Sequence, residues 1–209
     1  MRPLGGAGLG FATLALAATL AGCESRGVDT ARAGDRILGL PGGRVDDERA
    51  MIDRTLKSVG ALLDQLPLPA ERKRLLASLK PTHVVQGGQG FHVAATTDSI
   101  VLATSDLDVG WASNAIIVAA GGIHLAHCKN SIVISGRDVQ ISHDGGTGDG
   151  SLVVSKGNMH ISNARGTLIY AVEGVEIENA HEVRAFNTPD RKATTGSIDN
   201  TAIEPLFQK

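Results

Sequence analysis

Three histidines and two acidic residues recur at one position of a sequence repeat, together with one glutamine. This column of positions reads His92, Asp108, His124, Gln140, His160 and Glu176. A row of imidazole and carboxylate groups can hydrogen-bond the hydroxyl groups of a sugar chain or coordinate a metal ion. Because every member is polar, a plain solvated sheet face explains the column as well. The column is therefore a candidate ligand face on a repetitive structure.

A second group of residues has the types that bind zinc or copper, namely His127, Cys128, His143 and Asp144, with His124 close by in sequence. Two of them belong to another column of the repeat, which reads Trp111, His127, His143, Asn163 and Asn179. Side chains stacked at solenoid turns commonly form hydrogen-bonded ladders. Consecutive residues in a turn tend to point apart, so we favour a structural ladder over a metal site and expect no cofactor.

The motifs of common enzyme classes are missing from the sequence. It contains no Walker loop, no nucleophile elbow and no HExxH zinc motif. Arg137, Lys156 and Arg165 are scattered over different turns instead of clustering on one face. The formal net charge of −2 provides no basic field for nucleic acid. We therefore expect a protein that is not an enzyme and does not bind nucleic acid.

A repeat of apolar residues must position these side chains. Three columns contain no polar residue: the first reads Val84, Ile100, Ile116, Ile132, Leu152 and Leu168, the second Phe91, Leu107, Ile123, Val139, Met159 and Val175, and the third Val93, Val109, Leu125, Ile141, Ile161 and Ile177. Successive spacings are 16, 16, 16, 20 and 16 residues, and the longer one contains the glycine-rich insertion "HDGGTGDG".

Such a repeat indicates stacked units that cannot bury their apolar faces alone. Sixteen residues are too few for two helices, and each unit contains two short β-type runs. We predict a mainly β fold, a single-stranded parallel β-solenoid of about six 16-residue coils over residues 82–187. Residues 188–209 are expected to form a C-terminal loop and cap. The repeat region resembles right-handed parallel β-helices, and its short coils resemble bactofilins, bacterial cytoskeletal proteins, in architecture only.

The first strand of each coil is expected to expose a second apolar column, Val85, Val101, Ile117, Val133, Val153 and Ile169. An uncovered stripe of this size is unusual on soluble proteins. Residues 46–81 are predicted to form a helical hairpin with an N-terminal helix at 47–64 and a second helix around 70–79. The first helix spans about 27 Å and the coils about 24 Å, so we expect it to be the lid over this stripe. The second helix is expected to cap the start of the solenoid.

The N-terminal segment predicts export. Residues 1–22 form a short apolar run that is typical of a signal peptide. The run ends in "LAGC", Leu20 to Cys23, which resembles the bacterial lipobox. This resemblance implies that Cys23 is acylated and that the protein is anchored to the membrane, the outer membrane being favoured in a Gram-negative host because Glu24 is not the Asp of inner-membrane retention. Residues 23–45 are expected to be a flexible tether.

These observations predict a lipid-anchored protein of the cell envelope whose solenoid is a scaffold or a binding surface. Two alternatives remain open. One is a β-helix that binds or processes polysaccharide or peptidoglycan, and the other is a self-assembling, bactofilin-like scaffold. The expected partners are the membrane, through the lipid, and an envelope polysaccharide or another envelope protein.

Overall fold

The computed structural model describes residues 45–66, 70–144, 150–187, 193–199 and 201–205. The predicted signal peptide, Cys23 and the tether lie outside these residues, as do five residues of the coil insertion and the chain end from residue 206. Of the segments described, no helix is long and apolar enough to span a membrane.

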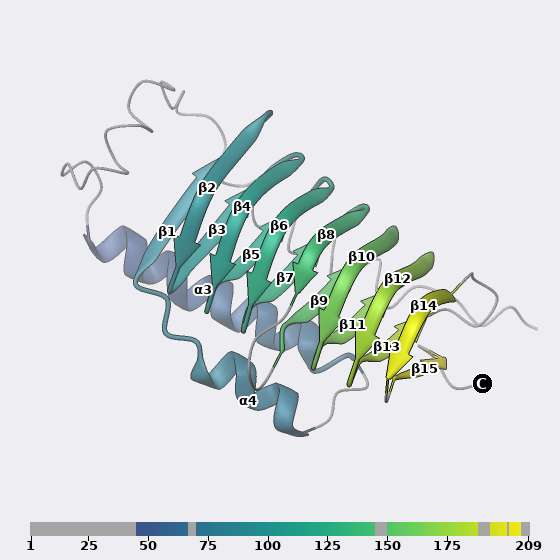
Figure 1. The fold of residues 1–209 in the computed structure, drawn as a ribbon. Helices are drawn as coiled ribbons and strands as arrows, with labels where there is room; N and C mark the ends of the chain where they lie inside the picture. Colours follow the sequence, from purple (N-terminus) through teal and green to yellow (C-terminus); the bar gives the residue numbers. More distant parts are fainter. Residues whose placement is uncertain (1–44, 67–69, 145–149, 188–192, 200, 206–209) are drawn as a thin grey trace, which may run out of the picture.

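The strands form two parallel sheets that face each other across the coil (Figure 1). Sheet A contains β1 (His83–Gly87), β3 (Ser99–Ala103), β5 (Ile116–Ala119), β7 (Ile132–Ser135), β9 (Leu152–Ser155), β11 (Leu168–Ala171), β13 (Arg184–Asn187) and β15 (Ala202–Pro205). Sheet B contains β2 (Phe91–Thr97), β4 (Leu107–Ser113), β6 (Ile123–Lys129), β8 (Val139–Asp144), β10 (Asn158–Arg165), β12 (Gly174–His181) and β14 (Ala193–Asp199).

The strand register follows the sequence repeat. Ile100 pairs with Ile116 in sheet A, and Leu107 pairs with Ile123 in sheet B, each a step of one 16-residue coil. The 20-residue step pairs Val139 with Met159. The predicted parallel solenoid is therefore confirmed, and the strands on either side of the insertion pair in register.

The core between the sheets contains the apolar residues that we predicted to point inward from sheet B. Val109, Leu125, Ile141 and Ile161 are fully buried there, and the side chains of the outward column beside them are exposed or half-exposed. The alternation of apolar and polar residues in the second strand of each coil therefore predicts both faces correctly.

The assignment of the first strand was wrong. Val101, Ile117, Val133, Val153 and Ile169 point into the core between the sheets and not outward. The outer face of sheet A contains the first of the apolar columns instead, including Ile100, Ile116 and Ile132. Both columns are apolar because sheet A is buried on both faces, so alternation could not distinguish inside from outside.

Two helices cover the outer face of sheet A (Figure 1). Helix α3 (Val45–Leu63) runs across the strands, and α4 (Ala70–Ser78) lies beside it on the same side of the solenoid. Val59, Leu62 and Leu63 of α3 are buried in one apolar cluster with the sheet, and Leu75 of α4 belongs to the same cluster. The predicted helical pair is confirmed, and α3 lies over sheet A. The predicted lid over the stripe from Val85 to Ile169 is wrong, because α3 covers the column of Ile100, Ile116 and Ile132.

The described parts of the two segments expected to cap the stack belong to the lid and to the solenoid. Helix α4 packs beside α3, and the range expected to be a C-terminal cap contains β14 and β15, which pair with β12 and β13. The sequence repeat does not reveal these last two strands, because Val175 and its partner Ala193 are 18 residues apart instead of 16 and a polar segment lies between them. Solenoid pairing therefore extends to Pro205, with seven strands in sheet B.

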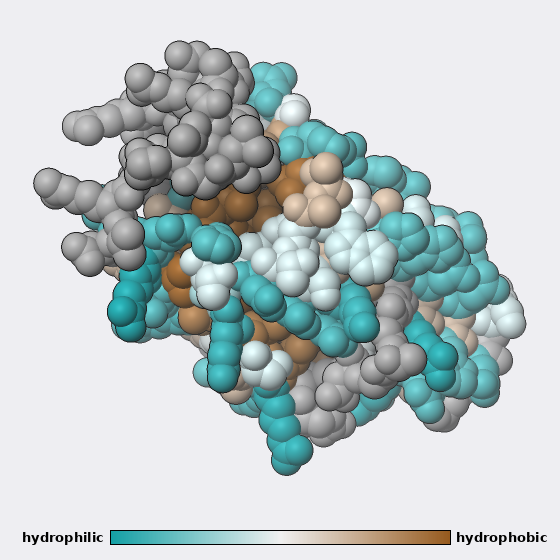
Figure 2. All heavy atoms as spheres, turned by 60° about the vertical axis from the view of Figure 1, so that its left-hand side comes forward, coloured by the Kyte–Doolittle hydropathy of each residue, from teal (hydrophilic) through white to brown (hydrophobic). Residues whose placement is uncertain are grey.

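Apolar side chains are half-exposed at the first coil. Phe91 and Val93 of β2, and Val84 of β1, are only partly buried, while their counterparts in the next coils are buried. Figure 2 shows hydrophobic atoms on the face turned toward this end of the stack. Helix α3 also hydrogen-bonds the edge strand β1: the Val84 backbone N–H donates to Glu48 Oε1 over 2.7 Å, and Gln86 Nε2 donates to Met51 Sδ.

The turn from sheet B back to sheet A uses a left-handed backbone residue in successive coils. Asp98, Asn114, Asn130 and Glu182 have φ angles of 47°, 51°, 47° and 55°, and Gly166 occupies the same column with 62°. Asp, Asn and Gly adopt this conformation at low cost. The column therefore fixes the corner at which these five turns reverse direction, whereas Gly150 in the same column has no positive φ.

Candidate ligand-binding groove

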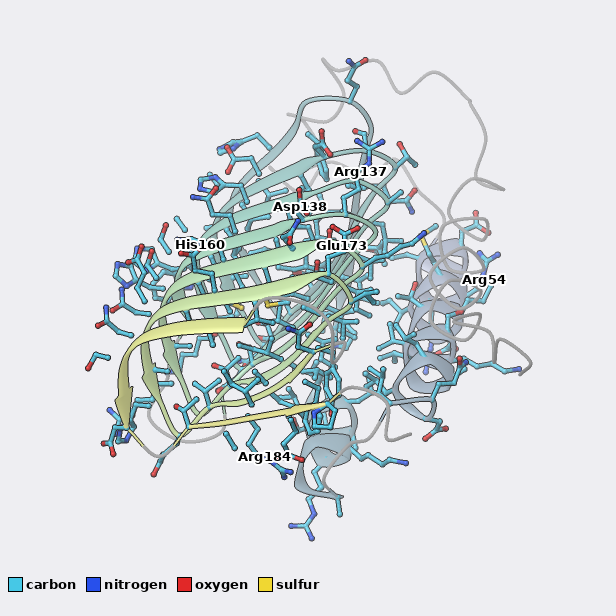
Figure 3. The ribbon with its side chains drawn as sticks, turned by 90° about the vertical axis from the view of Figure 1, so that its right-hand side faces the viewer. Arg54, Arg137, Asp138, His160, Glu173 and Arg184 are labelled. Carbon is cyan, nitrogen blue, oxygen red and sulfur yellow. The ribbon has the colours of Figure 1, made fainter. Side chains whose placement is uncertain are left out.

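An open groove crosses the outer side of sheet B where its strands begin. It has a volume of about 840 Å³ and is lined by three consecutive positions in each of the six coils from β2 to β12. All six residues of the predicted ligand face line it, in adjacent strands and in register: His92, Asp108, His124, Gln140, His160 and Glu176. Figure 3 shows His160 on the side of the solenoid opposite to α3. The residues predicted to share a face are therefore brought together.

One carboxylate orients two imidazole rings in the first half of the groove. Asp108 Oδ2 lies 3.2 Å from His92 Nδ1, and Asp108 Oδ1 lies 3.1 Å from His124 Nδ1. Each neutral ring that donates its Nδ1–H to Asp108 keeps a lone pair on Nε2 as an acceptor. These contacts of the described residues leave both Nε2 atoms available to a ligand.

The second half of the groove has its histidine flanked by acidic side chains. His160 lies between two carboxylates, with Glu176 Oε2 at 3.6 Å from Nδ1 and Glu178 Oε1 at 3.3 Å from Nε2. The side chains of His160 and Glu176 are 35% and 59% exposed, so water screens these contacts and we assign them little net stability. This half therefore offers carboxylate oxygens to a ligand, while its imidazole, that of His160, already contacts two carboxylates.

Two aspartates at the rim of the groove were not predicted from the sequence. Asp106 Oδ1 accepts the Gly122 N–H at 2.7 Å, and Asp138 Oδ1 accepts the Asn158 N–H at 2.7 Å, each from the following coil. A Cβ at Gly121 or at Gly157 would collide with the same carboxylate oxygens. The signal that could have revealed these supports is an Asp followed, in the next coil, by a Gly one position before the residue opposite the Asp: Gly121 for Asp106 and Gly157 for Asp138.

A strip of stacked rings and amides lies further along the sheet B strands. The ring centroids of Trp111 and His127 are 5.3 Å apart, and those of His127 and His143 are 5.0 Å apart at an interplanar angle of 16°. Asn179 Nδ2 donates to Asn163 Oδ1 at 3.1 Å. We call these five residues the stacking strip. The ladder predicted for this column is therefore observed.

The amide half of the strip is hydrogen-bonded to one histidine. Asn163 Nδ2 lies 3.4 Å from the Ser142 carbonyl oxygen, which can only accept, so this atom is the amide nitrogen. The same nitrogen donates to His143 Nδ1 at 3.0 Å. Hydrogen bonds therefore join Asn179, Asn163 and His143, and ring contacts continue the strip from His143 through His127 to Trp111.

The possible metal cluster does not form in the part of the chain that the structure describes, where no group of three or more ligating side chains has suitable geometry. His127 is exposed on the outer side of β6, while Cys128 is buried in the core, with its Sγ 3.3 Å from Ser151 Oγ. His143 stacks on His127, and the side chain of Asp144 lies outside the described set. Successive side chains of β6 point to opposite faces, so His127 and Cys128 point apart, as we expected for consecutive residues.

Comparison with protein-family models, curated proteins and solved structures finds no match for this chain. The geometry of the groove and the strip is therefore the basis for the function proposed below.

Proposed function

We propose that this protein is a lipid-anchored component of the cell envelope that binds an envelope polymer in the groove on sheet B and does not catalyse a reaction. The observation that supports binding most directly is the continuity of the groove over six coils. Sheet A cannot offer a comparable surface, because α3 and α4 bury its outer face. The exposed face of sheet B is therefore the natural place for a ligand.

The proposed anchor is the acyl chain on Cys23, at the end of the lipobox-like "LAGC" segment. A tether of residues 23–45 would separate the membrane from the domain, whose helix α3 begins at Val45. The outer membrane is the proposed location in a Gram-negative host. The groove would then face polymers within reach of that membrane.

Changing Cys23 to Ala should release the protein from the membrane fraction. The lipobox cysteine is the acceptor of the lipid, and no described helix can replace the anchor by spanning the bilayer. Cell fractionation followed by detection of the protein measures the effect, and we expect most of the variant in the soluble fraction. A Cys23→Ala protein that is processed and membrane-bound like the original would contradict the anchor.

The unlipidated Cys23→Ala protein also tests a second candidate function, the self-assembling scaffold. The half-buried Phe91 and Val93 at the first coil favour this candidate, because a second copy stacked end to end would bury them. Assembly predicts a ladder of sizes in gel filtration that grows with protein concentration. A single monomeric species at all concentrations supports the binding surface alone.

Co-sedimentation of the full chain with isolated insoluble envelope material tests the binding function. Asp108→Ala removes the acceptor that orients His92 and His124, so we expect the bound fraction to fall at least about fivefold. His83→Ala is the matched control, since His83 is exposed on β1 in sheet A and outside the groove. Equal binding by both variants would exclude the groove, and protease treatment of the envelope distinguishes a polysaccharide from a protein ligand.

A further inference from the structure

We propose that the outer face of sheet B binds a neutral, unbranched glycan chain that lies along the solenoid axis, across the strands, and stacks on Trp111. This inference rests on the proposed binding function and names the class of its ligand. It draws on three properties of the described residues, which are the charge of the groove, the spacing of its polar groups and the neighbouring stacking strip.

The charge of the groove excludes a polyanion. Four carboxylates line it, from Asp106, Asp108, Asp138 and Glu176, and none of its lining residues is Lys or Arg. Nucleic acid and sulfated or phosphorylated polymers need cationic partners, which this surface does not offer. The ligand must therefore be neutral or cationic.

The spacing of the polar groups indicates a polymer that runs along the stack. Equivalent residues in adjacent coils are about 4.8 Å apart, so the six positions of the ligand face span about 24 Å. His92 and His124 present Nε2 acceptors two coils apart, and Gln140 follows in the next coil with an amide that both donates and accepts. A chain of hydroxyl groups can pair with successive coils, whereas a compact ligand would use only one or two of them.

The stacking strip adds flat apolar surface further along the same strands of sheet B. Trp111 is 45% exposed and lies on β4 only three residues after Asp108. His127 contacts Trp111 with the two rings tilted by 38°, and it stacks on His143. Sugar rings combine hydroxyl edges with apolar C–H faces, so a glycan can use the polar groove and the aromatic surface together. A cationic peptide would satisfy the carboxylates but would not need acceptors repeated at every coil.

The fluorescence of Trp111 provides the readout, because it is the only tryptophan of the chain. Titration of the full chain in detergent with β-linked N-acetylglucosamine oligomers, from the disaccharide to the hexasaccharide, should change this fluorescence. We expect affinity to increase with oligomer length until the chain spans the groove. Oligolysine and dextran sulfate, at the same ionic strength, represent the cationic and anionic classes.

Substitution separates specific binding from adsorption. Trp111→Ala should weaken the binding of the longest oligomer at least about fivefold, measured by calorimetry because the fluorophore is lost. His124→Ala should weaken it by a similar factor, whereas the exposed His83→Ala control should bind like the original protein. Circular dichroism of each variant checks that the exposed substitutions leave the fold intact.

Several results would overturn the inference. It fails if affinity is independent of oligomer length, if oligolysine or dextran sulfate binds more tightly than every oligomer, or if no oligomer binds. When one of these results coincides with Asp108-dependent binding to envelope material, the groove is functional and only the ligand class is wrong. When envelope binding is also lost, the proposed function fails with it.

Discussion

Replacing Ile141 with Asp should unfold the solenoid under conditions in which the Gln140→Asp protein stays folded. Ile141 is fully buried between the two sheets, and its neighbours in register, Leu125 and Ile161, are buried as well. A carboxylate there loses its hydration and finds an apolar layer on each side, at a cost of several kcal/mol. That cost is a large part of the roughly 5–15 kcal/mol that stabilises a typical domain.

Gln140 is the matched control, because it is adjacent in sequence, lies in the same strand and is exposed. Asp at this position stays hydrated, so we expect a change within roughly 0.5 kcal/mol. Denaturant unfolding followed by circular dichroism compares the two variants. Equal losses of stability at positions 140 and 141 would refute the alternation of inward and outward residues in sheet B.

Leu62→Asp should detach the helical lid and expose the apolar outer face of sheet A. Leu62 is 2% exposed and belongs to the cluster that joins α3 to Ile116 and Ile132. Truncation of a buried leucine alone typically costs about 2–5 kcal/mol, and burial of the new charge adds to this. The uncovered stripe should then bind a hydrophobic dye and promote aggregation. Dye fluorescence and light scattering measure both effects.

Ala61→Asp controls for the charge itself. Ala61 precedes Leu62 near the C-terminal end of α3 but is exposed to solvent. The unfavourable interaction of a carboxylate with the helix dipole is therefore similar in both variants, and only the burial differs. We expect the Ala61→Asp protein to remain monomeric and dye-negative. A Leu62→Asp protein with the same behaviour would mean that the lid contributes little to covering sheet A.

The sequence predicted side-chain direction best where one face of a strand is buried and the other is exposed to solvent. In the second strand of each coil, apolar and polar residues alternate, so Ile141 was correctly predicted inside and Gln140 outside. The contrast comes from solvent, because only the outward side chains of sheet B reach water. The same logic identified the six residues of the ligand face before their contacts were known.

The sequence was ambiguous where burial is complete. Val133 and Ile132 are both apolar and both fully buried, one against sheet B and the other beneath the helices. When both faces of a strand are buried, both sets of alternating side chains are apolar. The apolar/polar alternation then disappears, so the direction of each side chain could not be predicted. The last coil was missed for a different reason, because its 18-residue step breaks the 16-residue register.

The spacing of apolar residues by itself determined the parallel solenoid, its coil length and the presence of an apolar stripe that a helix must cover. Each coil can bury its apolar residues only against the equivalent residues of the next coil, so the spacing of the repeat sets the pairing register of the strands. Only the tertiary structure decided which column of sheet A faces the helices, that Asp108 orients two histidines, and that Cys128 turns away from His127. Those outcomes depend on strand curvature, turn geometry and side-chain direction, which arise when the coils stack and which the apolar repeat does not specify.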